Sequence, residues 1–268
     1  MCGIVGYTGN RQAAPILLHG LARLEYRGYD SAGICVSSDS GLKTIKAGGK
    51  LINLIRLTDD GKSVTGTAGV GHTRWATHGD PTDVNAHPHV SCSGNIAVVH
   101  NGIIENYRKL KDFLISNGVT FQSETDTEVV VQLIDHFYSG DLLAAVQQTV
   151  SLLEGSYALG IVSPHEPGTL IAARKDGPLI IAHEPGESYL ASDVTAILKY
   201  TRSVSYLDDG EIAVLRPDGI AVYDAYGMPI EKEVTHIEWD ADAAQKGGYA
   251  HYMLKEIHEQ PKVCRDTV

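Results

Sequence analysis

The second residue of the chain is a cysteine, and it opens the short apolar run CGIVGY. Once Met1 is removed, that thiol belongs to the first residue of the chain. An α-amino group has a pKa of roughly 7.7–8.0, so part of it is neutral near pH 7 and can take the proton of the thiol on the same residue. Cys2 is therefore a candidate nucleophile for acyl transfer. The alternative is a small buried hydrophobic side chain on a strand, a common role of free cysteine.

Acyl transfer also needs hydrogen-bond donors for the oxyanion that forms during attack. Asn101 and Gly102 stand at the end of the predicted strand NIAVVHN (95–101) and offer a side-chain NH2 group and an unshielded backbone N–H group. An Asn-Gly pair after a strand is also typical of a plain turn. These two residues are candidates for an oxyanion hole, with the turn as the alternative.

Two charged residues suit the ends of a free amino acid. Arg74 presents a guanidinium fork that matches a carboxylate, and Asp126 presents a carboxylate that matches an ammonium group. A surface position is the alternative for each residue, and Asp126 also suits the N-cap of a helix that includes Glu128 in its first turn.

Histidines gather in one part of the sequence. Five of the twelve lie within thirty residues, namely His72, His78, His87, His89 and His100. A zinc or iron site is thus an alternative hypothesis, but the chain has no HExxH motif and the His-Pro-His spacing is not diagnostic of metal ligation. Structural histidines that are hydrogen-bonded in the core are the preferred interpretation.

Composition limits the class of protein. The chain has 268 residues, 43% hydrophobic and 21% charged, as expected for a folded globular protein. The formal net charge of −11 argues against nucleic acid and anionic membrane surfaces as main partners. The sequence has no apolar stretch long enough for a bilayer, and its four dispersed cysteines without a CxxC pair favour a reducing compartment, so we expect a cytoplasmic protein.

The pattern of elements predicts an α+β fold. Strand-like runs come first, helical patterns occupy the middle, and short β-branched runs separated by Pro, Gly and Asp return after Gly155. The simplest arrangement is two antiparallel sheets packed together with helices on their outer faces. From about Trp239 the pattern loosens, so we expect one domain over residues 2–239 and, over 240–268, a linker followed by the start of a further domain. The predicted helices cover residues 11–25, 106–118, 126–138 and 141–153, and the early strands cover 2–8, 31–37, 43–48, 68–75 and 95–101.

Six motifs together resemble the glutaminase domain of glucosamine-6-phosphate synthases, the glutamine:fructose-6-phosphate amidotransferases. They are CGIVGY, LEYRGYDSAG, HTRWATHG, NAHPH, HNGIIEN and SETDTE. The resemblance runs from Cys2 to the end of the chain. It implies the four-layer αββα sandwich of N-terminal nucleophile hydrolases, with glutamine as the substrate and no cofactor or metal.

The resemblance also implies roles for the candidate residues. Cys2 would attack the side-chain amide of glutamine, and Asn101 and Gly102 would form the oxyanion hole. Arg74 would bind the carboxylate of the substrate and Asp126 its α-ammonium group. The thioester on Cys2 would then be hydrolysed to glutamate.

Further residues match positions around the substrate in this family. Trp75, Thr77, His78 and His87 would line or close over the pocket, and RWATHGDP (74–81) resembles a loop that covers it. Arg27 and Gly28 resemble residues that support the nucleophile, and for Arg27 a purely structural ion pair remains an alternative.

The end of the chain resembles the connection to a further domain. The stretch KEIHEQP leads, in the family, into a sugar-isomerase domain, and Ala250 replaces an expected arginine in that connection. We therefore expect this chain alone to release ammonia into water, and the full-length enzyme to be a homo-oligomer. A non-catalytic module that retains the fold for contact with a partner is the alternative function.

Overall fold

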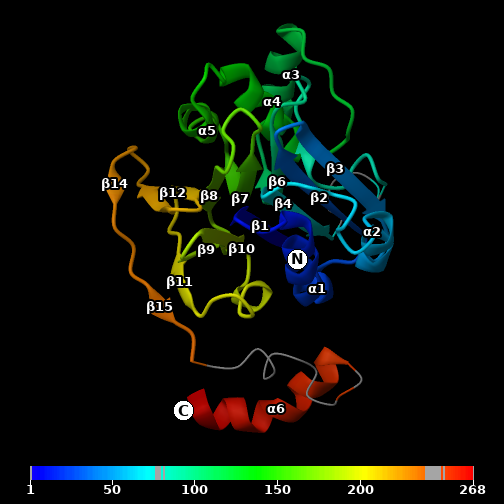
Figure 1. Ribbon diagram of the computed structural model, residues 1–268, viewed down its shortest axis with the longest axis vertical. Helices are drawn as coiled ribbons and strands as arrows, with labels where there is room; N and C mark the ends of the chain where they lie inside the picture. Colours follow the sequence, from blue (N-terminus) through cyan, green and yellow to red (C-terminus); the bar gives the residue numbers. More distant parts are fainter. Residues whose placement is uncertain (1, 76–79, 81, 239–248, 250, 268) are drawn as a thin grey trace.

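Two antiparallel β-sheets stacked face to face form the centre of the molecule, and helices cover both outer faces (Figure 1). The computed structural model describes residues 2–75, 80, 82–238, 249 and 251–267 of the chain. The arrangement confirms the predicted α+β fold with helical outer layers.

Eight strands form the first sheet, in the order β15-β11-β9-β10-β1-β4-β2-β3. Its central strands β1 and β4 pair antiparallel, with Gly3 opposite Thr73 and Ile4 opposite His72. Their ends therefore lie side by side, which brings the start of the chain next to Arg74. The strands of this sheet are β1 (Gly3–Gly9), β2 (Ser31–Ser38), β3 (Gly41–Gly48), β4 (Ala68–Arg74), β9 (Ile180–Glu184), β10 (Glu187–Ala191), β11 (Ser203–Tyr206) and β15 (Thr235–His236).

Seven strands form the second sheet, in the order β14-β13-β12-β8-β7-β6-β5. Strand β6 pairs antiparallel with β7 along its whole length, from Ala97 opposite Val162 to Ile104 opposite Gly155. The strands of this sheet are β5 (His89–Val90), β6 (Ala97–Ile104), β7 (Gly155–Val162), β8 (Leu170–Lys175), β12 (Ile212–Arg216), β13 (Gly219–Tyr223) and β14 (Pro229–Ile230).

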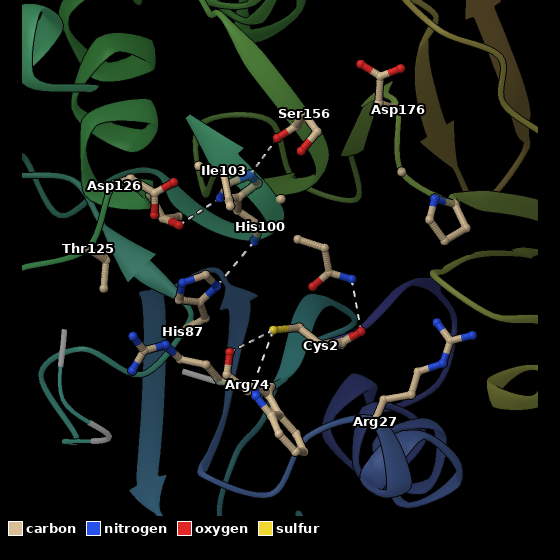
Figure 2. A pocket seen from close by; sticks show the side chains of 16 residues that line it. Cys2, Arg27, Arg74, His87, His100, Ile103, Thr125, Asp126, Ser156 and Asp176 are labelled. Atoms are coloured by element: carbon tan, nitrogen blue, oxygen red, sulfur yellow. Dashed lines mark hydrogen bonds between the residues drawn. The ribbon is translucent and has the colours of Figure 1, made fainter. Parts of the chain in front are cut away.

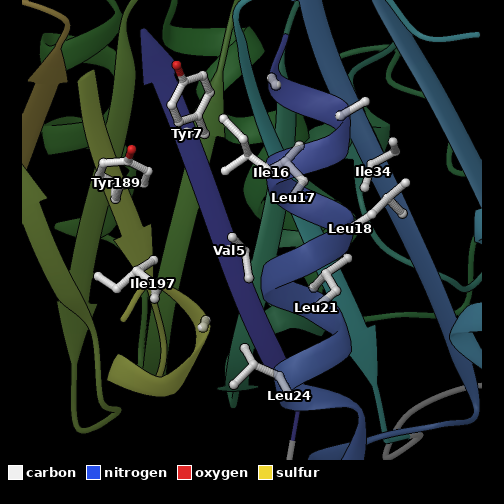
Figure 3. Close-up of a cluster of buried hydrophobic side chains, with 14 of the residues drawn as sticks. Val5, Tyr7, Ile16, Leu17, Leu18, Leu21, Leu24, Ile34, Tyr189 and Ile197 are labelled. Carbon is white, nitrogen blue, oxygen red and sulfur yellow. The ribbon is translucent and has the colours of Figure 1, made fainter. Parts of the chain in front are cut away.

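Helix α1 (Ala13–Leu24) shows why the outer layers form. Its buried apolar residues recur at helical spacing and pack in one cluster with Val5 of β1 (Figure 3). Helices α3 (Tyr107–Ser116), α4 (Thr127–Phe137) and α5 (Leu142–Val150) cover the second sheet in the same way. The buried stripe of α1 predicted from the sequence is confirmed, with Ala13, Ile16, Leu17, Leu21 and Leu24 at most 5% exposed.

A third apolar layer fills the space between the two sheets. It contains Ile4 and Val70 from the first sheet and Val99 and Leu170 from the second, all fully buried. This layer fixes the position of β1 and β4 relative to β6. The ends of these three strands frame the cavity described below.

Three elements differ from the sequence-based expectations. Helix α2 (Leu51–Leu57) was not predicted, because seven residues give too short a periodic pattern. Strand β6 continues to Ile104, so Asn101 and Gly102 lie inside the strand and not in a turn after it. Residues Tyr252–Thr267 form helix α6, in the segment predicted as a linker and the start of a further domain, where no helix was assigned from the sequence. The domain boundary at 239 stays a prediction, since residues 239–248 lie outside the described ones.

Two short 3-10 helices complete the fold, η1 (Glu25–Arg27) and η2 (Val194–Ala196). Helix α6 lies apart from the sandwich in Figure 1. None of the described helices is long and apolar enough to cross a membrane.

Candidate active site

A cavity of about 400 Å³ opens where β1 and β4 of the first sheet meet β6 of the second. In the view of Figure 2, Arg74 and Asp126 lie on one side of Cys2 and Arg27 and Asp176 on the other. The described residues that line it are Cys2, Arg27, Arg74, Trp75, His87, His100, Asn101, Gly102, Ile103, Thr125, Asp126, Thr127, Ser156, Asp176, Gly177 and Pro178.

Cys2 stands at the start of β1 with its side chain in the cavity. The backbone N–H group of Trp75 donates a hydrogen bond to Sγ at 3.2 Å, and the thiol lies 3.6 Å from the Trp75 carbonyl oxygen. Burial raises the pKa of the Cys2 thiol above its ordinary value, while the Trp75 N–H bond and the charge of Arg74 act in the opposite direction. At neutral pH the group is thus a thiol that requires a base before it can attack.

The other three cysteines have different surroundings. Cys35 is fully buried in β2, and burial raises its pKa to about 12. Cys92 and Cys264 are exposed, and all four thiols are free. Cys2 is the cysteine that combines partial exposure with a place in the cavity, which rules out the buried structural role considered from the sequence.

Gly28 lies behind the contact between Trp75 and the thiol. A Cβ atom at this position would come within 2.8 Å of the Arg74 carbonyl carbon and 3.0 Å of the Trp75 nitrogen. Any side chain would therefore push the Arg74–Trp75 peptide, and the N–H group that it carries would move relative to Sγ. Gly28 does not line the cavity but allows its wall to approach.

Asn101 connects the second sheet to the nucleophile. Its Nδ2 donates a hydrogen bond to the carbonyl oxygen of Cys2 at 3.2 Å, and its Oδ1 accepts one from His72 Nε2 at 2.9 Å. Each Nδ2 carries two hydrogens, so the second remains available to a group in the cavity.

Gly102 follows directly in β6 with a φ angle of +134°. A Cβ atom here would lie 2.1 Å from the carbonyl oxygen of Ser156 in β7 and 2.9 Å from His100 Nε2. Only glycine fits, because both the backbone angle and the space forbid a side chain. The backbone of β6 is therefore bare where it borders the cavity.

Arg74 ends β4 and is 4% exposed. One of its guanidinium nitrogens donates to the carbonyl oxygen of Asp80 at 3.2 Å. Burial lowers its pKa, and the acidic groups of Asp30 and Asp126 counteract that effect. A buried guanidinium at the wall of a cavity is suited to a carboxylate ligand.

Asp126 lies directly before α4, but its side chain does not cap that helix. Its Oδ2 instead accepts a hydrogen bond from the backbone N–H of Ile104 at 2.7 Å, which fixes the carboxylate at the cavity wall. Glu128 organises the preceding loop, because its two oxygens accept from the backbone N–H groups of Gln122 and Ser123. The capping role expected as an alternative for Asp126 is therefore wrong.

Four of the five clustered histidines, His72, His87, His89 and His100, are buried, and two of them, His87 and His100, line the cavity. The ring centroids of His72 and His87 are 4.2 Å apart, and those of His87 and His89 are 4.9 Å apart. Burial lowers the pKa of each, to about 3 for His72, so all are neutral at pH 7. No group of three or more metal-binding side chains occurs among the described residues. The ring nitrogens instead bond to neighbours such as Thr127 Oγ1, 2.8 Å from His100 Nδ1, and Thr125 Oγ1, 2.9 Å from His89 Nε2.

Arg27 lines the far side of the cavity, and its guanidinium forms an ion pair with Asp193 at 2.5 Å. Asp193 in turn caps η2 by accepting from the Thr195 backbone N–H group. The structural ion pair considered from the sequence is thus present, and the residue also borders the site.

Several lining residues were not assigned to the substrate site from the sequence. His100, Thr125 and Thr127 stood inside the motifs HNGIIEN and SETDTE, which gave a signal for them. Ser156 and the turn Asp176–Pro178 come from strand β7 and the end of β8, and no motif pointed to them. Of the earlier candidates, Thr77 and His78 lie outside the described residues, as does most of the expected lid at 74–81.

Comparisons with known proteins agree with this geometry. A family model described as a glutamine amidotransferase domain matches residues 72–199. The glutamine–fructose-6-phosphate aminotransferase (isomerizing) of Caldanaerobacter subterraneus subsp. tengcongensis is 54% identical over 268 residues, which is 100% of this chain and 44% of that protein. The enzyme of the same name from Aquifex aeolicus is 53% identical and is covered to 45%. Over residues 72–199 the chain therefore matches a glutamine amidotransferase domain.

Solved structures place the amidotransferase domain in the N-terminal nucleophile fold. The glutamine phosphoribosylpyrophosphate amidotransferase from B. subtilis, in complex with ADP and GMP, superimposes with a TM-score of 0.72 at 28% identity, over 84% of this chain and 49% of that chain. A class II glutamine aminotransferase domain protein from Silicibacter pomeroyi, at 17% identity and a TM-score of 0.57, shares the fold alone. The amidotransferase domain spans a little less than half the length of its curated relatives.

Proposed function

We propose that this domain hydrolyses the side-chain amide of glutamine to glutamate and ammonia, with Cys2 as the nucleophile. The observation that carries the proposal is the convergence of Cys2 Sγ, the Asn101 carboxamide and two opposite charges, Arg74 and Asp126, in one cavity. Glutamine has a matching set of groups: an amide at one end and a carboxylate and an ammonium group at the other.

The two charges hold the amino-acid end of the substrate. The Arg74 guanidinium binds the α-carboxylate, and the free oxygen of the Asp126 carboxylate binds the α-ammonium group. His87 and Trp75 complete the walls of this half of the cavity. Binding at both termini directs the side-chain amide toward Cys2.

Attack begins with proton transfer, because the Cys2 thiol is protonated at neutral pH. Once Met1 is removed, the α-amine of Cys2 takes this proton and Sγ bonds to the amide carbon. The resulting oxyanion accepts hydrogen bonds from Asn101 Nδ2 and the Gly102 N–H group. The amine then returns the proton to the departing nitrogen, the C–N bond breaks, and ammonia leaves a γ-glutamyl thioester. Water attacks the thioester and releases glutamate. Arg27 and Gly28 hold the surroundings of Cys2 in place.

The direct test measures glutamate and ammonia from the chain after Met1 removal, with a preparation that retains Met1 as the matched control. We expect turnover only in the processed form, because only that form has a free amine on Cys2. A diazoketone analogue of glutamine should label the chain covalently at one site, and peptide mass spectrometry should locate the label on Cys2. Equal activity of the two preparations, or a label on Cys92 or Cys264, would contradict the mechanism. A processed chain that binds glutamine but forms no ammonia would support the alternative of a non-catalytic module.

The relatives from Caldanaerobacter and Aquifex are, by name, glutamine–fructose-6-phosphate aminotransferases. We infer that the full-length protein transfers an amino group to fructose 6-phosphate, with a sugar-isomerase domain as the ammonia acceptor and a homo-oligomeric assembly in the cytoplasm. Four free cysteines are consistent with a reducing compartment. The isolated domain should form no glucosamine 6-phosphate from glutamine and fructose 6-phosphate, whereas the full-length protein should.

A further inference from the structure

His72 is a buried residue that the proposed reaction does not use. It lies in β4 of the first sheet, is 0% exposed, and is not among the described residues that line the cavity. Its Nε2 atom lies 3.0 Å from the carbonyl oxygen of His100 and 2.9 Å from Oδ1 of Asn101. Both partners belong to β6 of the second sheet, so this ring nitrogen bridges the two sheets directly behind Asn101.

These two contacts determine the tautomer of His72. A carbonyl oxygen only accepts, so the bond to His100 requires a hydrogen on Nε2. The other nitrogen, Nδ1, has no hydrogen-bond partner among the described residues and is buried. It is therefore a bare acceptor, and protonation there would bury an N–H group without a partner. Burial lowers the pKa of His72 to about 3, in agreement with a neutral ring.

The tautomer in turn determines which way the Asn101 carboxamide points. An N–H donor on His72 requires the oxygen of the carboxamide to face it, which leaves the NH2 group facing Cys2. The reversed carboxamide would set two donors against each other at His72 and two acceptors against each other at the Cys2 carbonyl oxygen. His72 therefore favours one of the two orientations of the Asn101 carboxamide that differ by a 180° rotation about its terminal C–C bond.

We propose that His72 is a positioning residue that holds the Asn101 NH2 group toward the reacting carbonyl. This inference rests on the proposed function, because it assigns His72 a part in the oxyanion hole of that reaction. His72 touches neither the substrate nor Sγ. It acts only through Asn101, and its effect should therefore appear in the rate of the chemical step and not in substrate binding.

Two substitutions separate the hydrogen bond from the packing. His72→Leu removes the donor, whereas His72→Gln keeps an N–H group the same number of bonds from the backbone. We expect His72→Leu to lower kcat by roughly ten- to a hundredfold, less than the loss expected for removing an oxyanion donor outright. KM for glutamine should change less than about twofold, since Arg74 and Asp126 are untouched, and His72→Gln should recover most of the rate. The matched control is His19→Leu, a partly buried histidine in α1 that contacts Tyr200; it should keep the parent rate.

A double-mutant cycle distinguishes positioning from general destabilisation. In an Asn101→Ala background His72→Leu should cost no further rate, because the side chain that it orients is gone. An equal loss in both backgrounds, a raised KM with unchanged kcat, or an unchanged kcat in folded His72→Leu would overturn the proposal.

A spectroscopic measurement covers the case in which these variants do not fold. Nitrogen NMR of the parent chain should show His72 neutral, with its proton on Nε2, from pH 6 to 8. A proton on Nδ1, or a charged ring in that range, would equally overturn the positioning role. A different result tests the proposed function: it fails if the processed parent chain forms no ammonia. If the parent chain is active and the His72 substitutions do not change kcat, only the positioning role of His72 is wrong.

Discussion

The two walls of the cavity contribute different kinds of residue. On the side of the first sheet, Cys2 lies directly before β1, Arg74 ends β4 and Trp75 directly follows it, where the backbone enters or leaves the sheet. The second sheet supplies Asn101 and Gly102 from within β6, paired along its length to β7. The first wall thus carries the nucleophile of the proposed reaction, and the second carries the hydrogen-bond donors of the oxyanion hole. The hydrogen-bond donors that stabilise the developing negative charge lie on the more constrained backbone, as expected for a preorganised oxyanion hole.

The largest difference between the walls should follow from removing the nucleophile. Cys2→Ala should abolish turnover, because nothing else in the cavity forms the thioester, yet the fold and glutamine binding should remain. Ammonia release and calorimetric binding of glutamine measure the two effects. Residual hydrolysis by the variant above that of a blank would show that Sγ is not the attacking atom.

Acid should act on the boundary between the walls, where four histidines are buried and neutral. Burial lowers their pKa values in the folded chain. Below about pH 6.5 the unfolded chain therefore binds more protons than the folded chain, and the free energy of unfolding decreases as the pH is lowered. Above about pH 6.5 they contribute no pH dependence. Each ring that stays neutral in the folded chain adds up to about 1.4 kcal/mol per pH unit below pH 6.5, so the free energy of unfolding should decline between pH 6.5 and 5.

Denaturant titrations at each pH measure this loss. His89→Gln removes one buried titrating ring and should reduce the slope. The exposed His236 provides the matched control, His236→Gln, which should leave the slope unchanged. A free energy of unfolding that is flat from pH 7 to 5 would contradict the burial of these rings.

On the second wall, Asn101→Ala should lower kcat by about a hundredfold or more, the usual scale for one oxyanion donor. KM should change little, because Asn101 is not proposed to bind the ground-state substrate. Steady-state kinetics measure both quantities. A change confined to KM would place Asn101 in substrate recognition instead.

Asp126→Asn should act on recognition, with kcat/KM reduced roughly tenfold through loss of a charged hydrogen bond to the substrate ammonium. Asparagine keeps an oxygen for the Ile104 N–H group, so stability should be preserved. Asp126→Ala removes that acceptor too and should also lower the free energy of unfolding, by about 1–3 kcal/mol. The pair of variants separates binding from folding when kinetics and denaturation are measured together. If Asp126→Asn bound glutamine as tightly as the parent, the ammonium contact would be wrong.

Gly28→Ala should give the smallest effect, on the first wall. The added methyl group must displace the Arg74–Trp75 peptide by a few tenths of an ångström, which shifts the N–H group that contacts Sγ. We expect a five- to tenfold lower kcat, well short of the roughly hundredfold that a 1 Å misplacement costs. Gly219→Ala, at a position with open space around it, is the control and should be silent.

The sequence predicted the layers and most of the candidate site for identifiable physical reasons. Regular apolar spacing revealed α1, the position directly after Met1 pointed to Cys2, and polar residues in short motifs pointed to Arg74, Asn101 and Asp126. The extension of β6 was missed because Asn-Gly has the local signature of a turn, which pairing with β7 overrides. Ser156 and Asp176 gave no signal, since only the tertiary pairing of β7 and β8 brings them to the cavity.

The apolar layer between the sheets has a role in the rate as well as in stability. Val70 and Val99, one from each sheet, set the spacing across which sulfur and carboxamide must meet. A substitution there that the fold tolerates, such as a change of one methylene, would still alter how far apart the two halves of the reaction stand. Hydrophobic residues that do not contact the substrate would therefore affect the reaction rate through the distance between the Cys2 sulfur and the Asn101 carboxamide.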